Sequence, residues 1–215
     1  KTMCNHLSKI VRQLENEVEL KDNDTVLDIA SNDGTLLKSY DNTNINLIGI
    51  DPTISQYKKY YPKDRIYLSS EFFSKEVFNS ISPTKYAKLV SSIAVFYDVP
   101  DPNLFAYDIA SILDKNGVWV MEQSYLPLLI KDLSFDSICH EHLAYYGFKQ
   151  IKLVAERANL RIFNVETNKM NGGSLRVFLC HSNSNRLSNN KNLNLIEKLE
   201  IDSKIDTHST FIKFK

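Results

Sequence analysis

Residues 25–37 read Thr25-Val26-Leu27-Asp28-Ile29-Ala30-Ser31-Asn32-Asp33-Gly34-Thr35-Leu36-Leu37. The apolar first half predicts a buried strand, and the small and acidic residues after it predict a tight turn that leads into a helix. A second apolar strand over 46–50 ends on Asp51. A turn that presents backbone N–H groups after one strand, together with an acidic residue at the end of the next strand, is typical of a parallel α/β sheet that binds a nucleoside.

The turn contains one glycine, Gly34, where the dinucleotide-binding G-x-G-x-x-G turn has three. Those three glycines allow the backbone to approach a pyrophosphate closely. This turn therefore favours a ligand with a ribose and an amino-acid tail, and S-adenosylmethionine fits that description. An NAD-binding oxidoreductase domain is the disfavoured alternative.

Composition excludes several classes of partner. The 215 residues carry 26 basic and 26 acidic side chains, so no charge excess points to nucleic acid or to an anionic membrane. No apolar run approaches the ~20 residues that a membrane span needs. The three cysteines, Cys4, Cys139 and Cys180, are widely spaced and form no C-x-x-C pair. We expect a cytoplasmic protein that binds neither nucleic acid nor membrane, and a chain that is a piece of a longer protein.

Alternating strand and helix patterns predict a class I methyltransferase architecture: a Rossmann-like α/β fold whose parallel sheet ends in an antiparallel hairpin, with helices on both faces. The expected strands are 25–30, 46–50, 65–68, 86–92, 118–122, 160–167 and 174–180. The expected helices are 4–20, one after Gly34, 52–60, one from Ser70-Glu71, 103–113 and 148–158. Residues 1–180 then form the core. Residues 181–215 form a linker and a helix, about 193–205, that lead to an incomplete C-terminal region.

The predicted cofactor site follows the ends of these strands. Asp28 is placed to accept a hydrogen bond from the methionine ammonium, and Asp51 to accept from both ribose hydroxyls. The turn and the N-terminus of the following helix offer backbone N–H groups. A plain βαβ unit with capping residues is the alternative, but a charge inside an apolar strand is costly without a partner. The predicted set is Asp28, Ala30, Ser31, Asn32, Gly34, Asp51, Ser92 and, near the adenine, Glu71 and Phe72.

A second group of candidates lies in residues 123–147, an unusually long insertion after the fifth parallel strand. It contains His140-Glu141-His142, followed by Tyr145 and Tyr146. Three interpretations are open: a metal site, a loop held by structural histidines, or a catalytic base with an orienting carboxylate. We predict no metal, because one residue separates the histidines and no cluster of further ligands is nearby. The tyrosines would line an apolar substrate pocket.

Three motifs in this order resemble the sugar C-methyltransferase family, over about residues 1–180. They are Asp28-Ile29-Ala30-Ser31-Asn32-Asp33-Gly34, the run from Phe135-Asp136 to His140-Glu141-His142, and Gly172-Gly173-Ser174-Leu175-Arg176. The resemblance implies S-adenosylmethionine as cofactor, His142 as base and Glu141 as a substrate contact. It also implies flanking domains, a small zinc-binding one before the core and a second Rossmann-like one after it. Cys139 stands where the family has a tyrosine, so it would lie near the substrate.

The predicted function is methyl transfer from S-adenosylmethionine to a carbon of a nucleotide-linked (keto)deoxysugar, with His142 as base and with His140 and Glu141 beside it. O-methylation of a sugar or small hydroxyl compound is the enzyme alternative. A cofactor-binding module that is inactive without its flanking domains is the non-enzyme alternative. Arg176 is predicted to reach a nucleotide phosphate or to be solvated, and Gly172-Gly173 also suits a plain hairpin turn.

Overall fold

The computed structural model describes residues 2–61 and 63–213. Its strands have the order β3-β2-β1-β4-β5-β7-β6 in one seven-stranded sheet. β1 pairs with β2 and β4 in parallel, β2 pairs with β3 in parallel, and β6 and β7 are antiparallel. The predicted α/β architecture with a terminal antiparallel pair is confirmed. By its internal contacts the chain divides into unit 1, residues up to 92 with 108–119, and unit 2, residues 93–107 with 120–215.

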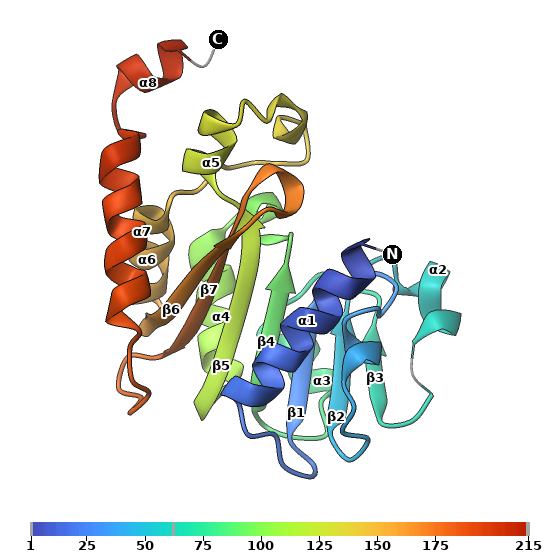
Figure 1. Cartoon of the computed structure of the whole chain (residues 1–215). Helices are drawn as coiled ribbons and strands as arrows, with labels where there is room; N and C mark the ends of the chain where they lie inside the picture. Colours follow the sequence, from blue (N-terminus) through green and yellow to red (C-terminus); the bar gives the residue numbers. More distant parts are fainter. Residues whose placement is uncertain (1, 62, 214–215) are drawn as a thin grey trace. The chain divides into compact units, whose positions relative to one another are not determined.

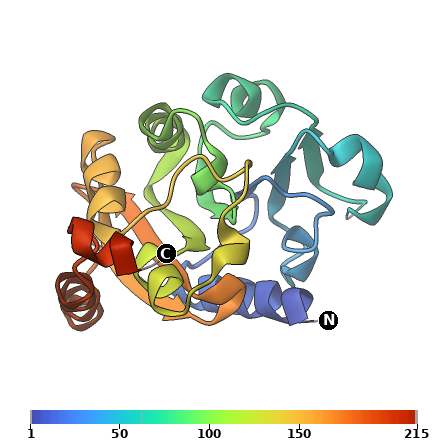
Figure 2. The ribbon, with the colours of Figure 1, turned by 90° about the horizontal axis from the view of Figure 1, so that it is seen from above.

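Unit 1 contains the first half of the α/β pattern. Its elements are α1 (Thr2–Glu17), β1 (Thr25–Ile29), η1 (Leu37–Ser39), β2 (Asn46–Ile50), α2 (Ile54–Tyr57), η2 (Lys58–Tyr60), β3 (Ile66–Ser69), α3 (Lys75–Ile81) and most of β4 (Ala87–Ile93). Every residue of β1 and β2 is buried, as expected of central parallel strands. The amphipathic helix α1 buries Ile10, Val11 and Leu14, and it lies on the opposite face of these strands from α3 (Figure 1, Figure 2).

Unit 2 is built around the antiparallel pair. The later elements of the chain are η3 (Phe96–Asp98), α4 (Pro102–Ile112), β5 (Leu113–Ser124), α5 (Leu126–Lys131), η4 (Phe135–Ser137), α6 (Phe148–Arg157), β6 (Leu160–Asn168), η5 (Met170–Gly172), β7 (Ser174–His181), α7 (Asn190–Ser203) and α8 (His208–Lys213). Both α6 and α7 pack against β6 (Figure 1). Residues 108–112 of α4 and residues 113–119 of β5 belong to unit 1.

The prediction of a helix directly after Gly34 is wrong. The chain there forms turns and the short 3-10 helix η1. The Asp33 carboxylate accepts hydrogen bonds from the backbone N–H and the hydroxyl of Thr35, at 3.0 and 2.6 Å. Such local side-chain bonds compete with helix formation. The N–H groups near the turn are therefore not those of an α-helix N-terminus.

Three other element boundaries also differ from prediction. The helix expected from Ser70-Glu71 begins at Lys75, because the Ser74 hydroxyl caps it by accepting from the Val77 N–H at 3.2 Å. The helix expected over 52–60 is split into α2 and η2. Residues 123–147, expected as a loop, contain α5 and η4. The chain therefore enters α3 later than the pattern suggests, leaving residues 70–73 outside any helix or strand.

The predicted C-terminal helix is α7, which is anchored on the rest of unit 2. The Glu200 carboxylate accepts hydrogen bonds from the backbone N–H groups of Phe148 and Lys149, at the start of α6. It also accepts one from the Tyr125 hydroxyl at 3.3 Å. A carboxylate is favourable at the N-terminus of a helix, where N–H groups have no partner within the helix. Glu200 therefore attaches α7 to α6 through a cap supplied from outside α6.

Candidate functional site

The turn after β1 has an unusual backbone. Ala30, Asn32 and Gly34 all have positive φ values, of 59°, 48° and 72°. A left-handed conformation is strained for a residue with a Cβ, so two such non-glycine residues in one turn require support from their surroundings. The turn follows the carboxyl end of β1, between β2 and β4, which is where open α/β sheets bind ligands. Its shape and place therefore suit a ligand-binding loop.

Tyr61 supplies much of that support, and sequence reasoning missed it. Its hydroxyl donates to the carbonyl oxygen of Asn32 at 2.7 Å and lies 2.7 Å from the Ser31 hydroxyl. Its ring covers Gly34, where a Cβ would lie only 2.7 Å from the ring. Burial raises the pKa of the Tyr61 phenol, which keeps it a hydrogen-bond donor. No local pattern marks this tyrosine, because its role depends on a contact across about thirty residues of chain.

Asp28 is a buried carboxylate with an incomplete set of partners. It is 4% exposed, and its Oδ1 accepts a hydrogen bond from the Ser91 hydroxyl at 2.6 Å. Burial raises its pKa to about 7, Ser91 opposes that change, and Asp51 adds to it. Among the residues that the structure describes, Ser91 is its one hydrogen-bond donor. A cationic ligand group would satisfy this carboxylate, so Asp28 fits the ammonium of S-adenosylmethionine.

Asp51 accepts more hydrogen bonds from within the chain than we predicted. Its Oδ2 accepts from the Asn32 N–H at 2.9 Å, and its Oδ1 accepts from the N–H and the hydroxyl of Thr53, both at 2.6 Å. A carboxylate has about four acceptor sites. About one is therefore left, which suits one ribose hydroxyl rather than the predicted two. Asp51 also ties the tip of β2 to the turn after β1.

The remaining predicted cofactor residues divide into two kinds. Ser92 is fully buried, and its hydroxyl accepts from the Trp119 indole at 2.9 Å, so that side chain serves the core. Glu71 and Phe72 lie in the loop between β3 and α3 and are exposed, Phe72 at 83%. An aromatic ring this exposed contributes little to the core and is free to stack on a planar ligand.

In unit 2, the structure orients the ring of His142. Its Nδ1 lies 2.7 Å from the carbonyl oxygen of Ser137. Because a carbonyl only accepts, Nδ1 carries the hydrogen, and Nε2 keeps a lone pair in the neutral ring. The Tyr145 hydroxyl donates to the same carbonyl at 3.2 Å. His142 therefore has the tautomer of a general base.

Two residues that follow β4, missed as site residues from the sequence, pack against this part of the insertion. The Tyr97 ring lies against the His142 ring at a tilt, with centroids 4.1 Å apart, and the centroid of the Phe96 ring lies 5.1 Å from that of the Tyr146 ring. The Tyr97 carbonyl accepts from the N–H groups of Leu143 and Ala144. Burial raises the pKa of Asp98, the next residue in the chain, while the charge of His142 lowers it. The one available signal was an aromatic run at the carboxyl end of a parallel strand.

The other predicted residues of the insertion differ in exposure. Cys139, His140 and Glu141 are exposed, Tyr145 is half-buried and Tyr146 is buried. Among residues 2–61 and 63–213, no group of three or more histidine, cysteine or acidic side chains is placed to hold a metal ion. Of the predicted triplet, His142 is the member that the structure surrounds with oriented partners.

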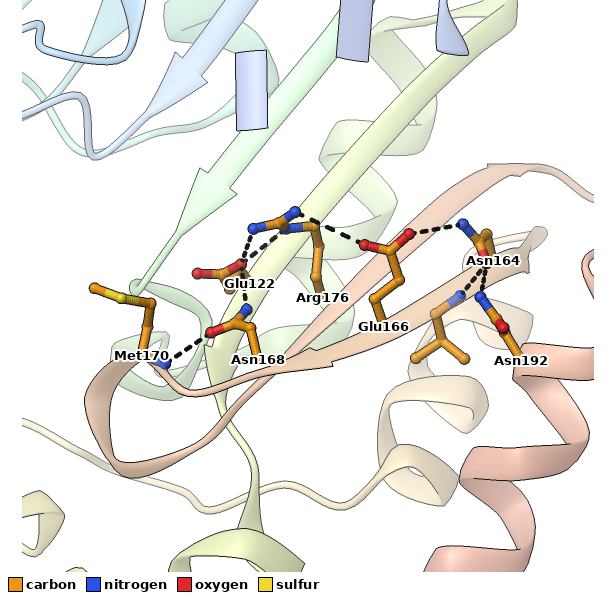
Figure 3. A network of polar contacts seen from close by, with 8 residues as sticks. Glu122, Asn164, Glu166, Asn168, Met170, Arg176 and Asn192 are labelled. Atoms are coloured by element: carbon orange, nitrogen blue, oxygen red, sulfur yellow. Dashed lines mark hydrogen bonds and ion pairs between the residues drawn. The ribbon is translucent and has the colours of Figure 1, made fainter. Parts of the chain in front are cut away.

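Arg176, predicted to reach a phosphate or to be solvated, is buried in an ion-pair network (Figure 3). Its Nε and Nη2 lie 2.8 and 2.7 Å from Glu122 Oε2, and its Nη1 lies 3.8 Å from Glu166. Asn168 also donates to Glu122, at 2.9 Å. Glu122 and Arg176 are 4% and 8% exposed. The charge of the Arg176 guanidinium is thus compensated inside unit 2. The ion pair with Glu122 joins β5 to β7.

The strand order, the left-handed turn after β1 and the acid at the tip of β2 define a class I methyltransferase fold. The model of the methyltransferase domain family matches residues 3–165, and the chain belongs to this family. The C-methyltransferase NovU of Streptomyces niveus is 28% identical over 180 residues, which are 82% of this chain and 42% of that protein. The chain therefore spans less than half the length of this relative.

Solved structures of low sequence identity share the fold. A Haloferax volcanii methyltransferase, solved in a complex with the Trm112 methyltransferase activator, superposes with a TM-score of 0.63 at 14% identity, covering 84% of this chain and 95% of that one. Magnesium protoporphyrin IX methyltransferase from Synechocystis, with bound SAH, gives a TM-score of 0.59 at 10% identity, covering 83% of each chain. The predicted enzyme class, an S-adenosylmethionine-dependent methyltransferase, is confirmed for the domain. Among the described residues, no helix is both long and apolar enough to cross a membrane.

Proposed function

We propose that this domain transfers a methyl group from S-adenosylmethionine to a carbon atom of a nucleotide-linked keto-deoxysugar, with His142 as the base. The observation that carries the proposal is the orientation of the His142 ring: its Nδ1 is hydrogen-bonded to the Ser137 carbonyl, and the ring lies against Tyr97. A carbon acid next to a keto group loses its proton only to a well-placed base, whereas many hydroxyl groups need less help. A named C-methyltransferase among the relatives supports the same choice.

The proposed roles of the residues follow from their surroundings. When bound, S-adenosylmethionine supplies a methyl group on an activated sulfonium. Asp28 holds the ammonium, and Asp51 accepts from a ribose hydroxyl. His142 takes the acceptor proton at Nε2, while Nδ1 keeps its hydrogen on Ser137. In this proposal Tyr145 and Tyr146 shield the acceptor from water, and Glu141, His140 and Cys139, which are exposed, contact the sugar nucleotide.

Isotope exchange tests the carbon route directly. We expect the full-length protein, with a panel of nucleotide-linked keto-deoxysugars in deuterium oxide, to exchange one ring C–H, as followed by NMR and mass spectrometry. His142→Gln should slow exchange and methylation by about 100-fold or more, since it removes the base. Affinity for S-adenosylmethionine should stay unchanged. His208→Gln, at an exposed histidine in α8, is the matched control.

The outcomes separate the alternatives. Methyl transfer to a hydroxyl without deuterium entering any ring carbon would support O-methylation. Cofactor binding with no transfer to any acceptor by the full-length protein would support a binding module. Unchanged turnover in His142→Gln would contradict the proposed base.

We also propose that Phe72 forms one wall of the adenine site. Phe72→Ala should weaken binding of S-adenosylmethionine by roughly 5- to 10-fold, the effect of one lost aromatic stack of about 1 kcal/mol. Because the ring is 83% exposed, the melting temperature of the free protein should not change. Calorimetric titration and thermal melts measure the two effects, with Leu187→Ala, 91% exposed, as control. Equal affinities for wild type and Phe72→Ala would remove Phe72 from the site.

A further inference from the structure

The helix α7 contacts both ends of the insertion over residues 123–147. Tyr125 lies near the start of the insertion, and its hydroxyl donates to the Glu200 carboxylate at 3.3 Å. The first two backbone N–H groups of α6, directly after the insertion, donate to the same carboxylate. α7 also packs against α5, the first helix of the insertion, and against α6 (Figure 1). One side chain of α7 therefore bridges the two ends of the insertion that contains His142.

The approach of α7 to the end of the insertion depends on a glycine. Gly147 is the last residue of the insertion, and a Cβ at this position would clash with Oε1 of Glu200 and lie 2.7 Å from Cδ1 of Ile205. The φ of Gly147 is −89°, which any residue adopts. The position therefore requires the absence of a side chain rather than conformational freedom of the backbone, and that absence is what admits the Glu200 carboxylate.

The donors around the Glu200 carboxylate suit its charge. Two of them are N–H groups at the N-terminus of α6, where a negative charge is favourable. The third is the hydroxyl of Tyr125, whose side chain is fully buried. Burial first, and then the charge of Glu200, raise the pKa of Tyr125, so the phenol keeps its hydrogen. Hydrogen bonds to a charged group are stronger than those between neutral groups, so this bridge resists opening.

A series of contacts leads from this bridge to the proposed base. Residues 142–147 form no helix or strand, so contacts at intervals fix the course of the chain. Two of their N–H groups donate to the Tyr97 carbonyl, at 2.9 and 3.2 Å. The Tyr146 carbonyl accepts from the Leu126 N–H at 3.1 Å. Glu200 supplies the next anchor along the chain, at the start of α6.

We propose that Glu200 is a positioning residue for methyl transfer, which holds both ends of the insertion so that His142 stays within reach of the acceptor. This inference rests on the proposed function, in which His142 is the base. A base acts only when it is held in the geometry of the reaction. The family model matches residues 3–165, so α7 lies beyond the matched domain. The segment that contains α7 is therefore part of the acceptor side of the site.

The test compares two acids of α7 in the full-length protein, with the same panel of nucleotide-linked keto-deoxysugars. We expect Glu200→Ala to lower kcat by about 10-fold, because a small displacement of a catalytic group is costly even when its cause is distant. Affinity for S-adenosylmethionine should stay unchanged, since Asp28 and Asp51 lie in unit 1. Glu197→Ala, which removes an exposed carboxylate paired with Lys152, is the matched control and should keep both.

The assays are run well below the melting temperature of every variant, so that loss of folded protein does not contribute. A merely structural role would lower the melting temperature of Glu200→Ala and leave its kcat equal to that of Glu197→Ala. That result would overturn the proposal.

Tyr125→Phe covers the case in which Glu200→Ala does not fold, because it removes one hydroxyl and leaves both N–H bonds of Glu200 in place. We expect kcat to fall by about 3-fold, the effect of one lost hydrogen bond. In the double variant the two losses should not add, since the hydroxyl acts through Glu200. Additive losses, or a kcat equal to that of wild type in Tyr125→Phe, would overturn the bridge between the two ends.

A measurement without substrate separates this proposal from the proposed function. Amide hydrogen exchange over residues 142–147, followed by mass spectrometry, should be faster in Glu200→Ala than in Glu197→Ala, because the loop loses an anchor. Equal exchange rates would overturn the positioning role, whatever the reaction is. Faster exchange in Glu200→Ala together with unchanged turnover in His142→Gln would confirm that Glu200 holds the insertion and contradict the role of His142 as base.

Discussion

Asp28→Asn should weaken binding of S-adenosylmethionine by about 100-fold or more, because it removes one partner of a buried charge pair. The same change should stabilise the ligand-free protein at pH 8. Wild-type Asp28 is 4% exposed, has one donor in Ser91, and has a pKa of about 7. A carboxylate kept charged in such a place opposes folding, whereas the neutral amide still accepts from Ser91. One substitution thus has opposite effects on stability and on affinity.

The pH dependence has a definite sign. The folded pKa of Asp28 lies above its ordinary value of 3.8, so between pH 4 and pH 7 the folded state binds more protons than the unfolded state. The stability that this group contributes therefore declines as pH rises through that window, by about 1.4 kcal/mol for each pH unit. Affinity for the ammonium has the opposite pH dependence. It weakens as pH falls below about 7, because Asp28 then takes up a proton.

Calorimetric titration between pH 6 and pH 8.5, together with urea unfolding, measures both effects. Asp64→Asn, at an exposed carboxylate in unit 1, is the control and should change neither. If Asp28→Asn binds the cofactor as tightly as wild type, then Asp28 is only a structural acid. If its stability falls at pH 8 as well, the buried carboxylate has a cationic partner in the free protein, and the assignment is wrong.

Arg176→Met should destabilise unit 2 by about 3–5 kcal/mol, since breaking a buried ion pair leaves the other charge uncompensated. Glu122, the charge left behind, is 4% exposed and is bonded by the Arg176 Nε at 2.8 Å. For a chain of this size the change corresponds to roughly 10 °C in melting temperature. Thermal and urea unfolding measure it. The double variant Glu122→Gln with Arg176→Met should recover part of the loss, because no charge is then left buried.

An exposed ion pair of the same unit provides the comparison. Lys152 and Glu197 lie 3.0 Å apart with side chains 49% and 46% exposed. Lys152→Ala should therefore change stability by less than about 1 kcal/mol. If Arg176→Met instead keeps its stability and loses much of its affinity for the sugar nucleotide, Arg176 contacts the phosphate, as one of the two predictions from the sequence holds.

The predicted strands are those that the structure contains, since each is an apolar run bounded by polar turns. The helix after Gly34 failed, because Asp33 and Thr35 satisfy each other locally and the backbone takes left-handed conformations at Ala30 and Asn32. Asp28 could be predicted from sequence because a charge inside an apolar strand is conspicuous. Tyr61 could not be predicted, because no local sequence pattern indicates its hydrogen bond to Asn32.

Local sequence patterns were enough to establish the class of the protein: apolar strands at regular intervals, a turn with one glycine, and an acid at the tip of the next strand. Local propensity and burial periodicity depend on residues that are neighbours in the chain, so they can be read without a structure. Which charges meet became known only from the folded chain. Folding paired Arg176 with Glu122, placed the Ser92 hydroxyl within hydrogen-bond distance of the Trp119 indole, and brought the Tyr97 ring against His142. Charge compensation and hydrogen bonding depend on distance in space, which the order of residues along the chain does not state.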